Sequence, residues 1–368
     1  MSEQGEPLLW LLRHRIAVEG AIPVSQFMAE VLLHPREGYY MRADPFGADG
    51  DFVTAPEISQ MFGEVLGLWC ADAWIRMGSP SGVILAELGP GRGTLMHDAL
   101  RAIGKVAPDF RRALSVHLVE VSPVLRAKQA QVLAGENPTW HAETADLPSG
   151  PLLLIANEFF DALPIRQFRR TPAGWCERLI EAEMASDRLR FVLDLPLPAM
   201  PGLLQPAFER LSYGATVEVC PAGKVIAEDL GQRLARDGGA ALFIDYSYDS
   251  RRPGFPGGDT LQAVRRHTPV AVLDHPGQAD ITAHVDFGAL AIAGEAGGAK
   301  ALGPVEQGPF LLSLGMTQRA EILKHGATPE QAAEIDSGLH RLTDRTQMGS
   351  LFQVMALVDS RLNGLAGF

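Results

Sequence analysis

Short apolar runs alternate with amphipathic segments along most of this chain. Mostly apolar segments of strand length lie at residues 83–88, 115–120, 152–156 and 240–244, and residues 139–143 are a further candidate for a short strand. Apolar residues recur at helical spacing between them, at residues 61–77, 123–133 and 223–236. Buried parallel strands have continuous apolar runs of this kind, so the alternation predicts a right-handed, doubly wound α/β sheet.

Helical patterns flank this core on both sides. Two short helices are expected within residues 8–33, separated at 20–23, and Ser25 could cap the second. The helix at 61–77 is expected to bury one apolar stripe. After residue 287 a helical pattern rich in small residues extends to about residue 296, and another covers residues 309–324. A last apolar run follows at 352–358.

The periodicity changes between residues 165 and 215. Residues 166–195 alternate between apolar and polar, with turn signals at 171–174 and 185–187, which is typical of antiparallel hairpins. Prolines then interrupt the chain, so this part is expected to be an insertion in the core. The predicted divisions are N-terminal helices and lid (1–60), first part of the core (61–164), insertion (165–215), and second part of the core with added helices (216–368).

A polar segment rich in glycine and proline precedes the first core helix, at residues 35–60. Loops of this length inside a compact chain tend to be functional lids or disordered. The aromatic residues Tyr39, Tyr40, Phe46 and Phe52 favour an ordered lid.

Charge and cysteine content narrow the classes of partner. The chain has 32 basic and 44 acidic residues, a formal net charge of −12 without a basic block, so nucleic acid is not the expected partner and a basic protein segment fits better. Its three cysteines show neither a paired motif nor metal-ligand spacing, so we expect reduced thiols and no metal. No apolar window has the length of a membrane span and no secretory signal is recognisable, so we expect a soluble protein.

The clearest candidate site follows the apolar run at 83–88. Glu87 lies at its end, and Gly89-Pro-Gly-Arg-Gly93 then forms a tight turn into a helical pattern. A dinucleotide fingerprint reads G-x-G-x-x-G, with a ribose-binding acid roughly 20 residues further on. This chain reads G-x-G-x-G, and its next acid at a strand end, Glu120, follows Gly91 by 29 residues.

This spacing is similar to the motif of S-adenosylmethionine-dependent methyltransferases, and an NAD-dependent oxidoreductase is a remote alternative. Glu87 could meet the amino group of the methionine moiety, Glu120 could accept both ribose hydroxyls, and Asp146 could approach the adenine amine or be a solvated loop carboxylate. The predicted cofactor-binding residues are Glu87, Gly89, Pro90, Gly91, Gly93, Thr94, Glu120 and Asp146. The other interpretation is that the glycines only tighten a strand-to-helix turn.

The chemical centre is expected at the end of the strand at 152–156, because doubly wound sheets bind ligands at the carboxyl ends of their strands. The chain reads Asn157-Glu-Phe-Phe-Asp161 there, where nucleic-acid amino methyltransferases commonly have Asn/Asp-Pro-Pro-aromatic. Carboxylates suit a guanidinium, so Glu158 and Asp161, with Asn157 beside them, are the hypothesised catalytic residues for an arginine acceptor. Alternatively, Glu158 has a structural role and Asp161 caps the next helix.

Two further residues are candidates for the acceptor side. His284, in Ala-His-Val-Asp, could be a general base or a histidine hydrogen-bonded within the fold. Tyr246 and the loop after it are expected to form a wall of the acceptor site.

Four blocks, at residues 51–64, 87–96, 156–164 and 282–287, together resemble the MidA-like methyltransferases. Mitochondrial members of that family are respiratory complex I assembly factors that dimethylate an arginine of a complex I subunit. The resemblance spans nearly the whole chain, including residues 348–352. It implies a Rossmann-like methyltransferase core with an N-terminal helical and loop cap and an inserted antiparallel segment, S-adenosylmethionine as cofactor, and a protein arginine acceptor in a subunit of NADH:quinone oxidoreductase.

The resemblance also bears on the lid and on the cellular setting. The block at 54–60 matches the family signature and implies a lid over the cofactor, with Thr54, Glu57 and Ser59. Ser247 departs from the family, where glycine is expected, and this could alter the acceptor loop. The N-terminus lacks a clear mitochondrial presequence, so a bacterial, cytoplasmic member is expected. The alternative function is an assembly or scaffold protein that binds S-adenosylmethionine without turnover.

Overall fold

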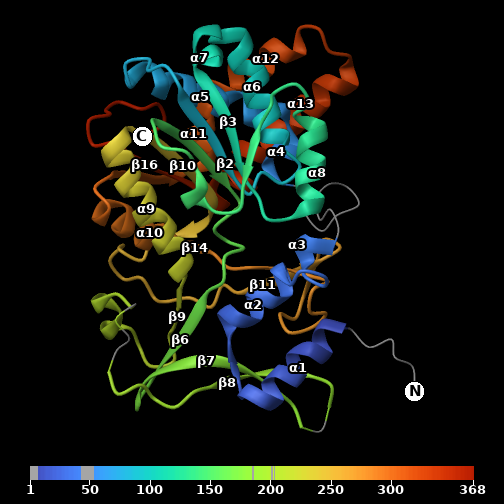
Figure 1. Ribbon diagram of the computed structural model, residues 1–368, viewed down its shortest axis with the longest axis vertical. Coiled ribbons are helices and arrows are strands. Elements are labelled where there is room, and N and C mark those ends of the chain that lie inside the picture. Colours follow the sequence, from blue (N-terminus) through green and yellow to red (C-terminus); the bar gives the residue numbers. More distant parts are fainter. Residues whose placement is uncertain (1–6, 43–53, 185, 200–201, 203) are drawn as a thin grey trace. The chain divides into compact units, whose positions relative to one another are not determined.

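The chain folds into two compact units (Figure 1). The computed structural model describes residues 7–42, 54–184, 186–199, 202 and 204–368. The first unit, called the sheet unit, consists of Val53–Phe160, Val225–Tyr248 and Phe287–Phe368. The second, called the hairpin unit, consists of Met1–Phe52, Asp161–Lys224 and Asp249–Asp286.

A large sheet with the strand order β15-β16-β10-β5-β2-β3-β4 organises the sheet unit. The strands in this order are β2 (Val83–Leu88), β3 (Leu114–Val119), β4 (Thr139–His141), β5 (Leu152–Asn157), β10 (Gly239–Tyr248), β15 (Lys300–Glu306) and β16 (Phe352–Val358). The strands from β10 to β4 are parallel, whereas β16 is antiparallel to both of its neighbours. The apolar runs in the sequence therefore form the predicted strands, and the predicted Rossmann-like fold is confirmed.

The order of the strands shows where this sheet binds ligands. From the central strand β2 the chain moves outward through β3 to β4, and then returns to β5 on the other side of β2. Doubly wound sheets bind ligands at such a reversal, outside the carboxyl ends of the strands. Glu87 lies near that end of β2, and Asn157 ends β5.

Helices cover both faces of the large sheet (Figure 1). Helix α5 (Gln60–Arg76) contacts β5 and β10, while α10 (Phe287–Ala296) contacts β10, β15 and β16. Leu242 of β10 belongs to the apolar core that includes α5, whereas Leu357 of β16, on the opposite face, packs against α10. The other helices of this unit are α4 (Ala55–Ile58), α6 (Thr94–Val106), α7 (Pro108–Ala113), α8 (Pro123–Val132), α11 (Gln307–Ser313), α12 (Met316–Lys324), α13 (Pro329–Thr343) and α14 (Met348–Leu351).

Helix α5 forms where it was predicted, but it is buried on nearly every side and not along one stripe. A Cβ at Gly63 would lie 2.7 Å from the Leu95 carbonyl oxygen, and one at Gly67 would lie 2.8 Å from Ala99 Cα. The two glycines thus let α6 pack closely on the side that the stripe would leave exposed. Glu64 is 2% exposed on this helix and is paired with the guanidinium of Arg319 at 2.6 Å.

The C-terminal part of the sheet unit contains elements that the hydrophobic pattern did not predict. Strand β15 contains few apolar residues and is positioned by antiparallel pairing with β16. Helix α13 begins with a capping box between Thr328 and Gln331. The helical pattern at 309–324 is interrupted at Gly315, whose φ of 87° separates α11 from α12.

The hairpin unit contains two antiparallel sheets and short helices. Its larger sheet consists of β1 (Ile22–Pro23), β6 (Arg166–Thr171), β7 (Gly174–Ala182), β8 (Leu189–Leu193) and β9 (Thr216–Val219), which confirms the predicted hairpins. The other elements include α1 (Pro7–Glu19), α2 (Val24–Leu33), α3 (Tyr39–Arg42), β11 (Gln262–Arg265), β12 (Thr268–Val270) and β13 (Asp280–Thr282). Helix α9 (Pro221–Asp237) includes residues of both units.

Two predictions for the N-terminal region have different outcomes. The helices expected within 8–33 are confirmed as α1 and α2, but the prediction that Ser25 caps α2 is wrong. Residues 22–23 pair with β7, so the chain enters α2 directly at Val24, and Pro23 is its N-cap. Residues 43–53 of the expected lid, with Phe46 and Phe52, lie outside the described residues.

Candidate active site

The turn after β2 has the backbone conformation that its glycines predict. Gly89, Gly91 and Gly93 have φ values of 58°, 53° and 86°, a region that L side chains rarely adopt. The Pro90 carbonyl accepts the Gly93 N–H at 2.7 Å, which closes the turn at the N-cap of α6. A Cβ at Gly89 would lie only 3.0 Å from Cδ2 of Phe159, so this glycine also leaves room for an aromatic ring that follows β5.

Glu87 is a buried carboxyl group with an unsatisfied oxygen. It is 3% exposed, and its Oε2 has no hydrogen-bond partner. The pKa of Glu87 is raised to about 8, chiefly by burial and also by the charge of Glu120, while a hydrogen bond from the Met96 N–H opposes the shift. Buried polar atoms are normally satisfied, so the open oxygen fits an ammonium donor such as that of the methionine moiety.

Glu120, directly after β3, is also buried, but each of its oxygens has a donor. The Ser122 N–H donates to Oε1 at 2.8 Å and Gln129 Nε2 donates to Oε2 at 3.2 Å. Burial raises the pKa of Glu120, and hydrogen bonds from Ser122, Gln129 and the Val121 N–H lower it, as does the charge of Arg126. A carboxylate has about four lone-pair sites, so these three donors leave room for a ribose hydroxyl.

Helix α4, from the predicted lid block, contacts the start of α6 and the turn after β5. Glu57 Oε1 accepts a hydrogen bond from Thr94 Oγ1 at 2.5 Å, and Glu57 Oε2 lies 3.5 Å from a guanidinium nitrogen of Arg92. The Ala55 N–H donates to Glu158 Oε1 at 3.3 Å. One short helix therefore links the glycine turn to the candidate catalytic carboxylate.

The other two predicted lid residues lie at helix starts. Thr54 is the N-cap of α4 and makes no side-chain capping bond, whereas Ser59 is the N-cap of α5 and accepts the Met61 N–H at 3.3 Å. The observed roles of Thr54 and Ser59 are therefore local to the α4–α5 junction.

Asn157, the last residue of β5, forms a strained turn with Glu158, Phe159 and Phe160, and this segment is called the acceptor turn. Glu158 is half-buried and has a φ of 51°, which is rare for a residue with a side chain and is often found at functional sites. Asn157 Nδ2 donates to Glu158 Oε1 at 2.9 Å, while the buried Asn157 Oδ1 has no partner. Burial raises the pKa of Glu158, and the Asn157 and Ala55 donors and the charge of Arg341 lower it.

Strand β10 holds the acceptor turn in place. The Glu158 N–H donates to the Ile244 carbonyl at 2.9 Å, and the Phe160 N–H donates to Asp245 Oδ2 at 3.1 Å. Asp245 is fully buried, and its Oδ1 accepts the Tyr246 N–H at 2.9 Å. The ring of Tyr246 packs on Phe352, with the ring centroids 4.0 Å apart.

Asp146 lies in a short 3-10 helix, η1 (Thr144–Asp146), and its side chain is used locally. Its Oδ2 accepts the Glu143 N–H at 3.1 Å in an exposed capping box. This contact favours the loop interpretation, whereas the approach to adenine stays a prediction.

Asp161 and His284 belong to the hairpin unit. Asp161 is 6% exposed, and its charge raises the pKa of Tyr40, which is raised chiefly by burial. The next element after Asp161 is strand β6, so the alternative that Asp161 caps a helix is wrong. The His284 N–H donates to Thr260 Oγ1 at 2.8 Å, and burial lowers the pKa of the His284 ring.

Sequence reasoning did not identify several residues around this site: Gln129, Trp140, Phe159 and Asp245. Asp245 follows a predicted strand, so its position was a usable signal. The role of Gln129 depends on how α8 packs against the glycine turn, which no pattern along α8 reveals.

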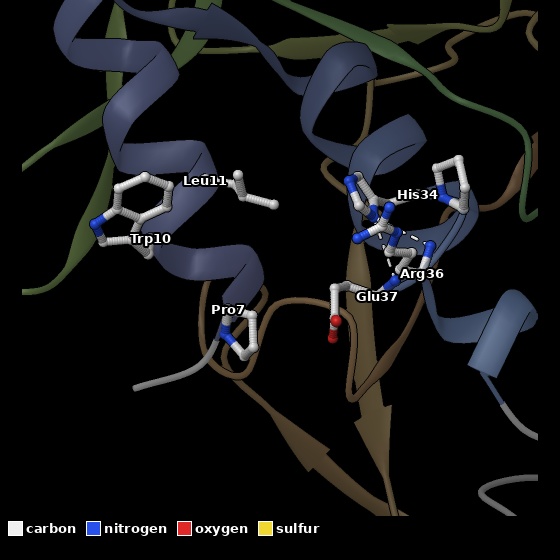
Figure 2. A pocket seen from close by; sticks show the side chains of 7 residues that line it. Pro7, Trp10, Leu11, His34, Arg36 and Glu37 are labelled. Carbon is white, nitrogen blue, oxygen red and sulfur yellow. Dashed lines mark hydrogen bonds between the residues drawn. The ribbon is translucent and has the colours of Figure 1, made fainter. Parts of the chain in front are cut away.

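A cavity of about 840 Å³ in the hairpin unit does not coincide with the predicted site. Figure 2 shows Trp10 and Leu11 of α1 on one side and His34, Arg36 and Glu37 after α2 on the other. His34 Nδ1 accepts the Glu37 N–H at 3.2 Å. The residues that line this cavity carry no arrangement that indicates methyl transfer.

No helix in the described part of the chain has both the length and the apolar character that a membrane crossing requires.

Comparisons with known proteins agree with this geometry. A family model described as S-adenosyl-L-methionine-dependent methyltransferase matches residues 65–305. The chain is 39% identical over 390 residues to the mouse protein arginine methyltransferase NDUFAF7, mitochondrial, covering 99% of this chain and 87% of that one. It is 40% identical over 392 residues to the Xenopus tropicalis protein of the same name, covering 98% and 88%.

A solved structure is similar over nearly the whole chain. It is a COG1565 superfamily member from Burkholderia thailandensis bound to S-adenosyl-homocysteine, with a TM-score of 0.84, 31% sequence identity, and coverage of 98% of this chain and 94% of that one. The glycine turn, the strand-end carboxylates and these relatives lead to one conclusion. The chain belongs to the MidA-like family of S-adenosylmethionine-dependent methyltransferases.

Proposed function

We propose that this methyltransferase acts on an arginine of a protein, and that Glu158 holds the acceptor guanidinium. The acceptor turn is the observation that carries the proposal. It combines the carboxylate of Glu158, whose backbone is strained, with the buried Asn157 Oδ1, which has no hydrogen-bond partner. Carboxylates bind guanidinium groups in bidentate pairs. The names of the mouse and frog relatives support an arginine acceptor.

The proposed cofactor contacts surround the glycine turn. S-adenosylmethionine supplies the methyl group when it is bound. Glu87 would hold the ammonium, the backbone at Gly89, Pro90, Gly91 and Gly93 would pass the carboxylate and ribose, and Glu120 would accept the ribose hydroxyls. The open oxygen of Glu87 and the lone-pair sites that the donors of Glu120 leave open support these roles.

Glu158 and Asn157 would orient the acceptor and would not take part in bond breaking. The Ala55 and Asn157 donors stabilise a negative charge on Glu158 Oε1 before an acceptor arrives. An incoming guanidinium could donate to Glu158, while Asn157 Oδ1 accepts a second N–H. Methyl transfer requires an aligned nucleophile, so holding the guanidinium is the main contribution expected of this turn. Asp161 remains the proposed second carboxylate.

The remaining predicted residues are proposed to shape the site. Glu57 would keep α4 against the glycine turn through Thr94, with Thr54 and Ser59 at the two ends of that helix. Tyr246 would form part of the acceptor wall, and His284 is retained as a candidate base or structural residue.

The proposed acceptor is a subunit of respiratory complex I, as the family resemblance implies. We also propose that this member works in the bacterial cytoplasm, although the names of the mouse and frog relatives include the word mitochondrial. The experiment incubates the purified protein with S-adenosylmethionine carrying a labelled methyl group and purified complex I subunits. Label on an arginine, located by mass spectrometry, supports the proposal, and label confined to another residue type contradicts it.

A scaffold that binds S-adenosylmethionine without turnover is the second candidate. Titration of the cofactor into wild type and Gly91→Val separates the two functions. The strained valine side chain at a φ of 53° should abolish binding, and a melting curve checks that the variant folds. Cofactor binding by wild type without transfer to any subunit would favour the scaffold.

A further inference from the structure

The side chain of Gln129 connects two parts of the cofactor site that come from different strands. Gln129 lies on α8 and is 0% exposed. Its Nε2 donates to the Gly91 carbonyl at 2.8 Å and to Glu120 Oε2 at 3.2 Å. One amide group therefore bonds both the glycine turn after β2 and the carboxylate after β3.

The orientation of this amide is determined by Trp140. The indole Nε1 of Trp140 donates to Gln129 Oε1 at 2.8 Å, and an indole N–H is only a donor. The amide oxygen must therefore face Trp140, so that both amide hydrogens point toward Gly91 and Glu120. Gly93 packs against Gln129, since a Cβ built at Gly93 would lie in ordinary van der Waals contact with Gln129 Cα and Cγ at 3.5 Å.

We propose that Gln129 is a positioning residue that makes the enzyme select cofactors with an intact ribose diol. By fixing Glu120 Oε2 relative to the glycine turn, Gln129 holds the carboxylate with both oxygens ready to accept hydroxyl hydrogens. The Gly91 carbonyl and the Arg92 N–H belong to one planar peptide group, so the hydrogen bond from Gln129 to that carbonyl also fixes the direction of the Arg92 N–H. The inference rests on the proposed ribose role of Glu120.

The main test compares two probes, S-adenosylhomocysteine and its 2′-deoxyadenosyl analogue, by calorimetric titration. Wild type should prefer the intact nucleoside by about tenfold or more, since the lost contact is a hydrogen bond to a charged group. Gln129→Met keeps the length of the side chain but removes both donors, so the preference should fall to about threefold or less. The matched control is Gln131→Met on the same helix, where the side chain is exposed and the preference should stay unchanged.

A pH series provides a readout that a purely structural role would not affect. Gln129→Glu should bind S-adenosylhomocysteine poorly at high pH and recover as the pH falls, because the introduced carboxyl group can donate a hydrogen bond toward Glu120 or Gly91 only when it is protonated. Gln129→Met should not recover. Other charged or titratable groups also lie around Glu120, namely Glu87, Arg126 and the stacked rings of His117 and His141. These groups are the same in every variant, so comparing each variant with wild type at each pH removes their contribution.

The outcomes separate this inference from the proposed function. Loss of discrimination in Gln129→Met with retained discrimination in Gln131→Met supports the role of Gln129. Full discrimination in Gln129→Met overturns that role and leaves the ribose role of Glu120 intact. A wild type that does not discriminate overturns the ribose role, and the inference falls with it. If Gln129→Met does not fold, Trp140→Phe is used in its place. Trp140→Phe removes the indole N–H that orients the Gln129 amide, so the preference for the intact ribose should also weaken.

Discussion

Two regions at the carboxyl edge of the large sheet differ in how their polar atoms are satisfied. At the ribose edge, formed by Glu120, Gln129 and Trp140, both carboxylate oxygens and the amide group have protein partners. At the acceptor turn, Asn157 Oδ1 is buried without a partner and Glu158 has a left-handed backbone. The difference suggests a cofactor site that is organised before its ligand binds and an acceptor site that its ligand completes.

The largest effect is expected from Glu158→Gln in the acceptor turn. Loss of the charge that holds the guanidinium should lower the methyl-transfer rate by about 100-fold or more, which is typical when a positioned electrostatic group is removed. Binding of S-adenosylhomocysteine should stay within about twofold, because the ribose edge is untouched. Rate assays and titrations on the same preparation, with the exposed Glu334→Gln as control, would check this. Transfer at the wild-type rate would remove Glu158 from the mechanism.

The next effect is expected from Glu120→Ala at the ribose edge. It removes an acceptor of two hydroxyl hydrogens, and at about 1.5 kcal/mol for each bond, the lower end of the range for a bond to a charged group, the affinity for S-adenosylhomocysteine should fall by about 100-fold. Calorimetry measures the affinity, and the melting temperature without ligand shows whether the variant is folded. An affinity close to that of wild type would show that this edge does not hold the ribose.

A smaller effect that depends on pH is expected from Glu87→Gln. Glu87 becomes charged as the pH rises through about 8, and only the charged form can pair with an ammonium. The ratio of variant to wild-type dissociation constants should therefore rise from about one near pH 6 to about ten above pH 8, while the titration of the ligand itself cancels in the ratio. A ratio that stays constant across this range would contradict the assignment.

The raised pKa of Glu87 also affects the stability of the ligand-free protein. Charging Glu87 favours ligand binding, but it disfavours the folded state. A carboxyl group whose pKa is raised by folding from 4.5 to about 8 favours the folded state only while it is protonated. The ligand-free wild type should therefore lose stability as the pH rises from 4.5 toward 8, and Glu87→Gln should lose less. Chemical denaturation at several pH values measures this difference, and parallel curves for the two proteins would speak against a buried, titrating Glu87.

The smallest effect is expected from Asp146→Ala. The Asp146 carboxylate is exposed and already accepts the Glu143 N–H, so removing it should change cofactor affinity by less than about twofold. A loss of tenfold or more would instead support the predicted contact with adenine. This variant therefore tests whether the cofactor site includes Asp146 in addition to the ribose edge.

The sequence predicted the parts of this site that depend on local order. Strand ends place Glu87 and Glu120, and a glycine turn needs positive φ, so these features follow from short patterns. The partners of Gln129 and Phe160 could not be found in this way. The amide of Gln129 bonds a carbonyl 38 residues away, and the Phe160 N–H bonds a carboxylate 85 residues away, so both contacts require the packed sheet.

The same limit explains the errors in the fold. The apolar stripe of α5 was visible, but its glycines approach α6 only in the folded unit, and this closes the side expected to be exposed. The proposed cap at Ser25 failed because residues 22–23 pair with a strand from a distant segment. Local patterns identified the elements, whereas their burial and exact ends depended on neighbours.

The most direct test of the proposed arginine acceptor is mass spectrometry of complex I. The subunits are compared between cells with the wild-type protein, cells without it, and cells that have only the Glu158→Gln variant. Methylation of a specific arginine should be present in the first sample and absent from the other two. The same arginine methylated in all three samples, or methylation restored by Glu158→Gln, would contradict the proposed role of the acceptor turn.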